Sequence, residues 1–293
     1  MKCYVCSNDL IAVADKLYKC TSCKTLQRLN PEEYYQNILE VYNSKYFAER
    51  YESRYGRKAS EDIENMRKIT HRRLDTIENI YLREGECSGC GSGSCGGCYV
   101  RNFVSSLKNK SLLDIGCGIG VFIDMAKRRG FNIRGIDINK EILHLLPPDI
   151  RDRVIITDFA NYETNEKFDI ITIWYVIEHL PNPREVLRKV WGLLKYGGIL
   201  AISTPNGNGF TQTFKPKFYY SLVPEDHIFE FSPDSLSILL KEENFKVIKI
   251  VNTGFHPDRV SRIPIIKNIL ELYQRITNVG DTFEIYAVKK VQI

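Results

Sequence analysis

Three glycines in a short segment, Gly116, Gly118 and Gly120, are the first residues of this sequence whose spacing suggests chemistry. They follow an apolar run and precede a segment with helical spacing. Glycine permits positive φ and a close approach of backbone to ligand, and a helix N-terminus that follows attracts an anion. The G-x-G-x-G spacing departs from the dinucleotide fingerprint, because Val121 stands where that fingerprint has its third glycine. The segment predicts a ligand-binding turn.

Acidic residues stand near the ends of successive predicted strands. Asp114 directly precedes the glycines, and Asp137 follows about 20 residues on, where an acid can hold two ribose hydroxyls. Asp158 and Phe159 end the next strand, in position for an adenine amino group and ring face. Carboxyl ends of parallel strands share one crevice, so these groups are expected at a single site. A helix-cap or turn role stays open for each acid.

Eight of the nine cysteines form four C-x-x-C pairs. In a chain without a recognisable secretion signal this spacing favours metal thiolates over disulfides. Cys3, Cys6, Cys20 and Cys23 predict a zinc ribbon over residues 1–30. Four thiolates make a closed tetrahedral site with no position for substrate, so we expect a structural metal that stabilises a unit lacking its own core.

The second set of pairs, Cys87, Cys90, Cys95 and Cys98, lies in an insertion at 85–98 made almost entirely of cysteine, glycine and serine. Such a composition cannot build a core and predicts a loop. Binding of zinc or of an iron–sulfur cluster and a flexible insertion with free thiols are alternatives that the sequence leaves open.

Strand–helix alternation then predicts an α/β fold with a Rossmann-like, seven-stranded sheet in residues 111–293. Helices are expected over Val121–Arg129, Lys140–Leu146, Arg184–Lys195 and Pro233–Glu242. The expected strands are Ser111–Ile115, Phe131–Ile136, Val154–Ile156, Phe168–Trp174, Gly198–Ser203, Lys246–Val251 and Phe283–Val288.

Residues 31–110 are expected to form a helical leader, tyrosine-rich at first and then an amphipathic helix over 58–83. The aromatic segment at about 207–231 is too long for a tight connection and predicts a cap over an acceptor pocket. A second insertion at 252–281 is expected to shape that pocket or a homodimer contact.

The chain has 41 basic and 36 acidic residues, a formal net charge of +5. This bias is mild for a nucleic-acid binder. Because no apolar run is long enough to cross a bilayer and the first residues lack a signal-peptide core, we expect no membrane span and a cytoplasmic location.

The run from Leu112 to Asn206 resembles the class I S-adenosylmethionine-dependent methyltransferases, especially the branch with ubiquinone-biosynthesis O-methyltransferases and methyltransferases of surface-sugar pathways. The N-terminal leader is similar to the zinc-binding leader of some sugar methyltransferases, whereas the insertion at 85–98 departs from the common pattern. The segments that carry the resemblance are Leu113–Gly120, Gly135–Ile138, Phe168–Trp174, Glu178–Pro183, Gly197–Asn206 and Asp226–Pro233.

The resemblance implies that the glycine turn cradles the methionine part of the cofactor, Asp137 binds the ribose and Asp158 the adenine. Trp174 and Tyr175 would flank the sulfonium, since aromatic faces attract cations. The implied cofactor-binding set is Asp114, Gly116, Gly118, Gly120, Asp137, Asp158, Phe159, Trp174 and Tyr175.

The predicted reaction is methyl transfer to a small molecule or glycan, at oxygen. A hydroxyl acceptor needs a base, for which histidine has a suitable pKa. We expect His227 first and His179 second, with a loop-positioning hydrogen bond as the alternative for His179. Two other functions stay open: an RNA methyltransferase that uses the zinc ribbon for recognition, and a non-catalytic metal-binding scaffold.

Overall fold

The computed structural model describes residues 1–41, 62–84, 107–261, 263–277 and 279–290 of the chain. The chain folds as two compact units, each assembled from separate segments. The first unit comprises Met1–Glu40, Ile173–Trp191 and Ile202–Ala287, and the second comprises Val41–Thr172, Gly192–Ala201 and Val288–Ile293. The second half of the tyrosine-rich leader and the insertion at 85–98 lie outside the described residues.

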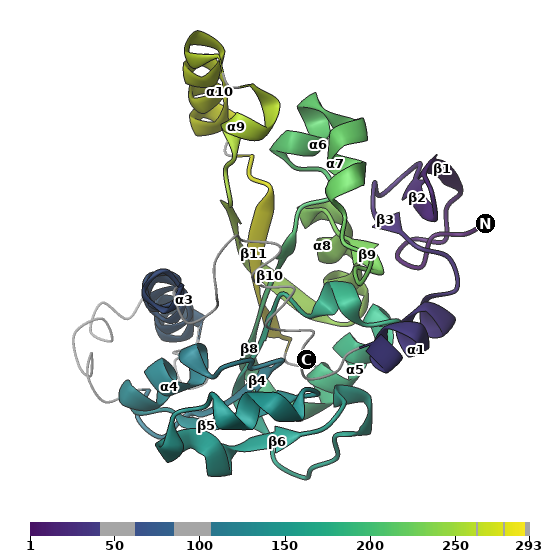
Figure 1. Cartoon of the computed structure of the whole chain (residues 1–293). Coiled ribbons are helices and arrows are strands. Elements are labelled where there is room, and N and C mark those ends of the chain that lie inside the picture. Colours follow the sequence, from purple (N-terminus) through teal and green to yellow (C-terminus); the bar gives the residue numbers. More distant parts are fainter. Residues whose placement is uncertain (42–61, 85–106, 262, 278, 291–293) are drawn as a thin grey trace, which may run out of the picture. The chain divides into compact units, whose positions relative to one another are not determined.

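A seven-stranded sheet confirms the predicted fold class (Figure 1). Its order is β10-β11-β8-β7-β4-β5-β6, and β4 pairs with β5, and β5 with β6, in parallel register. Each expected strand is present with shifts of a few residues at its ends. The strands are β4 (Ser111–Ile115), β5 (Asn132–Asp137), β6 (Val154–Ile156), β7 (Phe168–Trp174), β8 (Leu194–Pro205), β10 (Phe245–Thr253) and β11 (Thr282–Lys289).

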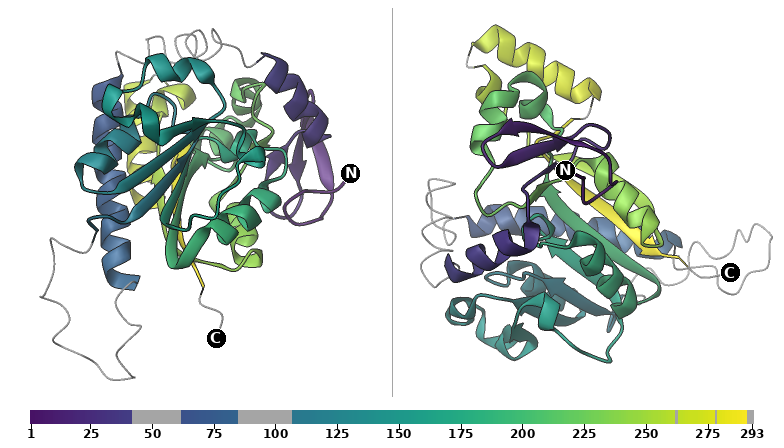
Figure 2. Two further views of the ribbon diagram at one scale, coloured as in Figure 1. Left: turned by 90° about the horizontal axis from the view of Figure 1, so that it is seen from below. Right: turned by 90° about the vertical axis from the view of Figure 1, so that its right-hand side faces the viewer.

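Every residue of β7 is buried. This matches a strand covered on both faces, for which a continuous apolar run rather than alternation is typical. In the second unit, helix α4 (Val121–Arg128) lies beside α3 (Ile63–Glu84), as both views show (Figures 1 and 2). The amphipathic helix expected over 58–83 is therefore confirmed from Ile63 onward.

The helix expected over Lys140–Leu146 is present as a 3-10 helix at Lys140–His144. Asn139 caps it by accepting a hydrogen bond from the Glu141 N–H at 3.0 Å. Pro147 and Pro148 follow closely, and the residue before a proline avoids helical ψ, so too few residues remain for a stable α-helix.

In the first unit, the N-terminal hairpin joins a strand from far along the chain. The order of this second sheet is β1-β2-β3-β9, with β3 antiparallel to β9 and Leu26 opposite Glu230. The expected ribbon is thus extended by a strand that sequence analysis placed in the cap. The strands are β1 (Leu10–Ala14), β2 (Leu17–Cys20), β3 (Leu26–Gln27) and β9 (Phe229–Glu230).

The remaining described helices of the first unit include α8, which follows β9 directly. A capping box begins α8: the Ser232 hydroxyl accepts the Ser235 N–H, and the Ser235 hydroxyl accepts the Ser232 N–H. None of the helices in the described ranges is long and apolar enough to span a membrane. The helices are α1 (Pro31–Val41, of which the first unit holds all but the last residue), α5 (Pro183–Leu193, which ends just beyond the first unit), α6 (Phe210–Phe214), α7 (Pro216–Leu222), α8 (Pro233–Glu242), α9 (Pro257–Val260) and α10 (Pro264–Thr277).

Asp169, near the start of β7, joins three elements of the second unit. Its Oδ2 accepts hydrogen bonds from the Ser111 N–H at 2.9 Å, the Ser111 hydroxyl at 2.8 Å and the Lys195 ammonium at 2.7 Å. Burial alone raises the pKa of Asp169, but these donors outweigh it and hold the pKa below its usual value.

We expect Asp169→Asn to destabilise the protein by about 1–3 kcal/mol at pH 7, since the buried donors lose a charged partner. A depressed carboxyl pKa contributes stability above the unfolded pKa, and this is lost as pH falls through the folded pKa. In urea unfolding, the difference in free energy of unfolding between wild type and variant should become smaller below about pH 4. Asp149→Asn, at an exposed pair with Lys127, is the control; a difference that does not change with pH would contradict the assignment.

Candidate functional site

The glycine turn between β4 and α4 has left-handed backbone at each of its three glycines, with φ of 75° at Gly116, 51° at Gly118 and 78° at Gly120. Other residues adopt this region only with strain. Asp137, at the tip of β5, stabilises the turn: its Oδ2 accepts the Gly118 N–H at 2.8 Å and its Oδ1 accepts the Asn139 N–H at 2.9 Å. The structure therefore brings the glycines and Asp137 together, as the sequence predicted.

Asp114 is buried below the turn, and its Oδ1 accepts a hydrogen bond from the Thr172 hydroxyl at 2.6 Å. Burial raises the pKa of Asp114 to about 7, against the opposing effects of Thr172 and Arg73. The carboxyl group thus supports the strand from which the turn emerges.

Asp158 and Phe159 follow β6, as expected. The Asp158 Oδ1 accepts the Ala160 N–H at 2.9 Å and so caps a 3-10 turn at Phe159–Asn161. The turn role left open for this acid is therefore present, and Phe159 is buried beside it. An adenine contact by either residue stays a prediction.

Trp174 and Tyr175 end β7, in the first unit. Trp174 is buried, whereas Tyr175 is 42% exposed and has a φ of 58°. Its N–H donates to the Ser203 carbonyl at 2.8 Å, which fixes this bend. A bulky residue at positive φ is uncommon and costs energy, and such strain gathers at functional sites.

The two histidines expected to serve as bases lie together in the first unit. The His179 and His227 rings meet edge to face, with centroids 4.7 Å apart. The neighbouring Glu178 carboxylate completes a group whose nearest ligand-type atoms all lie within 4.8 Å of one another. Burial raises the pKa of Glu178 to about 7, against the opposing charge influence of His227.

His227 is oriented by a buried carboxylate. Its Nδ1 lies 2.5 Å from Oε1 of Glu230, whose other oxygen accepts a hydrogen bond from the Tyr219 hydroxyl at 2.5 Å. Burial, with Glu230 nearby, raises the pKa of Tyr219, so this phenol stays protonated as the donor. A carboxylate that accepts from Nδ1 leaves the imidazole lone pair on Nε2.

The N-terminal segment holds the backbone on which His227 stands. The Arg28 guanidinium donates to the His227 carbonyl at 2.9 Å and to the Pro224 carbonyl at 3.0 Å, and the Arg28 N–H donates to the Ile228 carbonyl at 2.9 Å. Sequence reasoning gave no role to Arg28 or Glu230. The signal that could have indicated a role for Glu230 is its position, since it is an acid within the aromatic run that follows His227.

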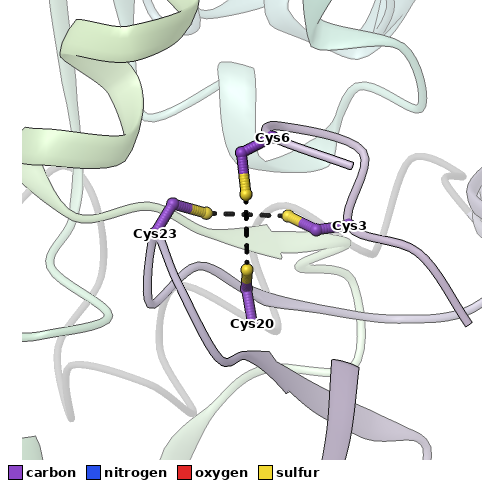
Figure 3. Close-up of side chains that lie close together, drawn as sticks. All are labelled: Cys3, Cys6, Cys20 and Cys23. Atoms are coloured by element: carbon purple, nitrogen blue, oxygen red, sulfur yellow. Dashed lines mark hydrogen bonds between the residues drawn. The ribbon is translucent and has the colours of Figure 1, made fainter. Parts of the chain in front are cut away.

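The four N-terminal cysteines point toward one another (Figure 3). Their sulfurs are 3.6 Å apart between Cys3 and Cys23 and 3.4 Å apart between Cys6 and Cys20. Disulfide sulfurs would be about 2.05 Å apart, whereas four thiolates about 2.3 Å from one tetrahedral zinc ion lie about 3.8 Å apart. The spacing fits a metal site. The pairs expected at Cys87–Cys98 lie outside the described residues.

A family model described as a methyltransferase domain matches residues 98–250, more than half of the chain. The chain belongs to this methyltransferase family. It is a class I S-adenosylmethionine-dependent methyltransferase, which favours an enzyme over the alternative of a non-catalytic scaffold.

The ubiquinone biosynthesis O-methyltransferase of Glaesserella parasuis serovar 5 (strain SH0165) is 29% identical over 176 residues, 54% of this chain and 75% of the relative. Its counterpart in Actinobacillus pleuropneumoniae serotype 7 (strain AP76) is 34% identical over 120 residues, 37% of this chain and 51% of the relative. This chain spans just over half the length of most of the curated relatives that it matches.

Among solved structures, magnesium protoporphyrin IX methyltransferase from Synechocystis PCC 6803 with bound SAH superposes with a TM-score of 0.56 at 14% identity. The match covers 87% of this chain and 99% of that chain. At this identity the likeness shows a shared fold, which agrees with the sheet described above.

Two glycine substitutions separate folding from cofactor binding. In Gly120→Ala the new Cβ would lie 2.6 Å from Leu146 and 2.8 Å from Ile150, so we expect a loss of about 1–3 kcal/mol in stability. A Cβ at Gly118 meets nothing within 4 Å and adds only backbone strain of about 1–2 kcal/mol. We expect the cofactor to lie beside Gly118, where this added Cβ would contact it.

Gly118→Ala should therefore weaken S-adenosylhomocysteine binding at least about tenfold, the effect of a lost 1.4 kcal/mol. Thermal unfolding with and without S-adenosylhomocysteine measures both effects. An unchanged ligand-induced shift in Gly118→Ala would remove this turn from the cofactor site.

Proposed function

We propose that the enzyme transfers a methyl group from S-adenosylmethionine to a hydroxyl oxygen of a small molecule or glycan. The observation that carries this proposal is the His227–Glu230 pair, a buried imidazole whose Nδ1 is held by a carboxylate. That arrangement makes Nε2 a proton acceptor of fixed direction, which deprotonation of a hydroxyl requires.

The cofactor-binding role is proposed for the turn and strand tips described above. Asp137 supports this assignment, because its carboxylate is already held at the tip of β5 by two backbone N–H groups and keeps acceptor capacity for ribose hydroxyls. The proposed set is Asp114, Gly116, Gly118, Gly120, Asp137, Asp158, Phe159, Trp174 and Tyr175.

The names of the relatives support oxygen as the methylated atom, since both are ubiquinone biosynthesis O-methyltransferases. A small-molecule acceptor fits the proposal better than RNA, for which the mild net charge offers no support. Residues 207–231, with α6, α7 and β9, remain the proposed acceptor cap. The expected homodimer stays a prediction.

In the proposed step the acceptor hydroxyl gives its proton to Nε2 of His227. The oxygen then attacks the methyl carbon in line, and the carbon–sulfur bond breaks with its electron pair on sulfur, which leaves as a neutral thioether. Protein groups supply alignment and exclude water. His179 is the second candidate for the base; its Nδ1 lies 2.7 Å from the Asp226 carbonyl, so the loop-positioning bond expected as its alternative role is also present.

We propose zinc at Cys3, Cys6, Cys20 and Cys23, in a structural role. The ion would stabilise the hairpin that ends in β3, and β3 pairs with β9 beside His227. Zinc at the ribbon would therefore help to hold the catalytic base, although it touches no substrate.

His227→Gln is expected to lower kcat by about 10²–10⁴, the usual contribution of a positioned base. Affinity for S-adenosylhomocysteine should stay unchanged. Labelled S-adenosylmethionine with fractionated cell extract identifies the acceptor, after which steady-state kinetics compares the variant with His144→Ala, an exposed histidine. Equal loss of kcat in both variants, or none in either, would remove His227 as the base.

Cys20→Ser is expected to remove one zinc ion per chain and to lower kcat while S-adenosylhomocysteine affinity is kept. The physical reason is that the ribbon supports β9, whereas the glycine turn belongs to the other unit. Metal content, kcat and ligand affinity are measured together, with Lys2→Ala on the ribbon surface as control. A matching fall in cofactor affinity would contradict the selective role.

A further inference from the structure

We infer that Glu178, His179 and His227 form a second metal site, distinct from the cysteine cluster, that binds a divalent transition-metal cation such as Zn²⁺. Two imidazoles and one carboxylate offer three ligand atoms within 4.8 Å of one another. Ligands about 2.0–2.2 Å from a cation lie about 3–3.5 Å apart, so side-chain rotations that close the group by about an ångström complete the site.

Both imidazoles are oriented as metal-binding histidines are. The His179 Nδ1 lies 2.7 Å from the Asp226 carbonyl oxygen, and the His227 Nδ1 lies 2.5 Å from the Glu230 carboxylate. Each acceptor fixes a hydrogen on Nδ1 and the lone pair on Nε2. Histidine ligands almost always donate their second N–H to a carbonyl or carboxylate in this way.

The Glu178 carboxylate is fully buried. Within the described part of the chain neither oxygen meets hydrogen-bond geometry, and the Thr204 hydroxyl only weakly lowers its pKa. A buried ionised carboxylate without a partner is strongly unfavourable. A cation held with His179 and His227 provides that partner for both oxygens.

The charges around the group favour a dication. Its contacts bring together three buried carboxylates, of Glu178, Asp226 and Glu230, and one buried guanidinium, of Arg28. With neutral imidazoles and all three carboxylates ionised, these groups carry a net charge of two negative charges. A divalent cation cancels that charge without protonating either histidine.

The ligand set indicates the class of metal and what it would do. Two imidazoles with one glutamate are typical of catalytic zinc and of other borderline divalent cations, and they leave a position open. This last step rests on the proposed function: an acceptor oxygen in the open position would lose its proton more readily. With both Nε2 lone pairs on the cation, His227 would no longer accept the proton. The cation would instead lower the pKa of the bound hydroxyl, and the proton would leave to water.

The test compares zinc content of the full-length wild type, Glu178→Gln and His144→Ala after saturation and dialysis. Glu178→Gln keeps the shape of the side chain but removes its charge. We expect it to hold one zinc ion fewer per chain than the wild type, with His144→Ala equal to the wild type. Because the cysteines bind the same amount of zinc in each protein, the difference in zinc content between wild type and variant reports this site alone. His179→Asn, at a side chain 17% exposed, gives the same readout if Glu178→Gln does not fold.

Cobalt identifies the ligands. A chelator first removes zinc from this site while the cysteines keep theirs. Co²⁺ added afterwards should give visible d–d absorption without a thiolate-to-cobalt charge-transfer band, and Glu178→Gln should lose that absorption. Equal zinc content in wild type and Glu178→Gln would overturn the inference and leave a proton as the partner of Glu178. A thermal shift with S-adenosylhomocysteine in the same samples shows separately whether the proposed function stands.

Discussion

A carboxylate taken out of water must have a partner, and this constraint organises both units of the enzyme. Asp137 accepts hydrogen bonds from two backbone N–H groups and thereby shapes the glycine turn. Asp169 accepts hydrogen bonds from Lys195 and Ser111 and so joins neighbouring strands. Glu230 accepts hydrogen bonds from Tyr219 and His227 and so orients the His227 imidazole. In the described part of the chain, Glu178 differs from these acids because neither of its carboxylate oxygens meets hydrogen-bond geometry, and it lies beside the two histidines where chemistry is proposed.

The N-terminal ribbon is part of this arrangement rather than an appendage. β3 pairs with β9, and Arg28 donates to the carbonyl of His227 from the same segment. The backbone that carries the proposed base is therefore held by residues about 200 positions earlier in the chain. The proposed zinc ion at the four cysteines would stabilise β3 and, through the β3–β9 pairing, the position of the His227 imidazole.

The sequence predicted most of the sheet because buried strands such as β7 are continuous apolar runs with turn residues at their ends. It also predicted the glycine turn and Asp137, whose positions follow from strand ends. It did not predict the β3–β9 pairing or the Arg28 and Glu230 contacts, since these join distant segments and leave no periodic pattern. The short helix at Lys140 was predicted, but its 3-10 type was not, since the prolines that follow leave too few residues for an α-helix.

The proposed function of the enzyme requires that the glycine turn and the acids beside it bind a sulfonium nucleoside. Calorimetric titration of the folded wild-type protein with S-adenosylhomocysteine measures this directly. We predict saturable heat with one site per chain, and a dissociation constant that rises when Asp137 is replaced by alanine. No heat with either S-adenosylhomocysteine or S-adenosylmethionine, from protein that unfolds cooperatively, would contradict the account.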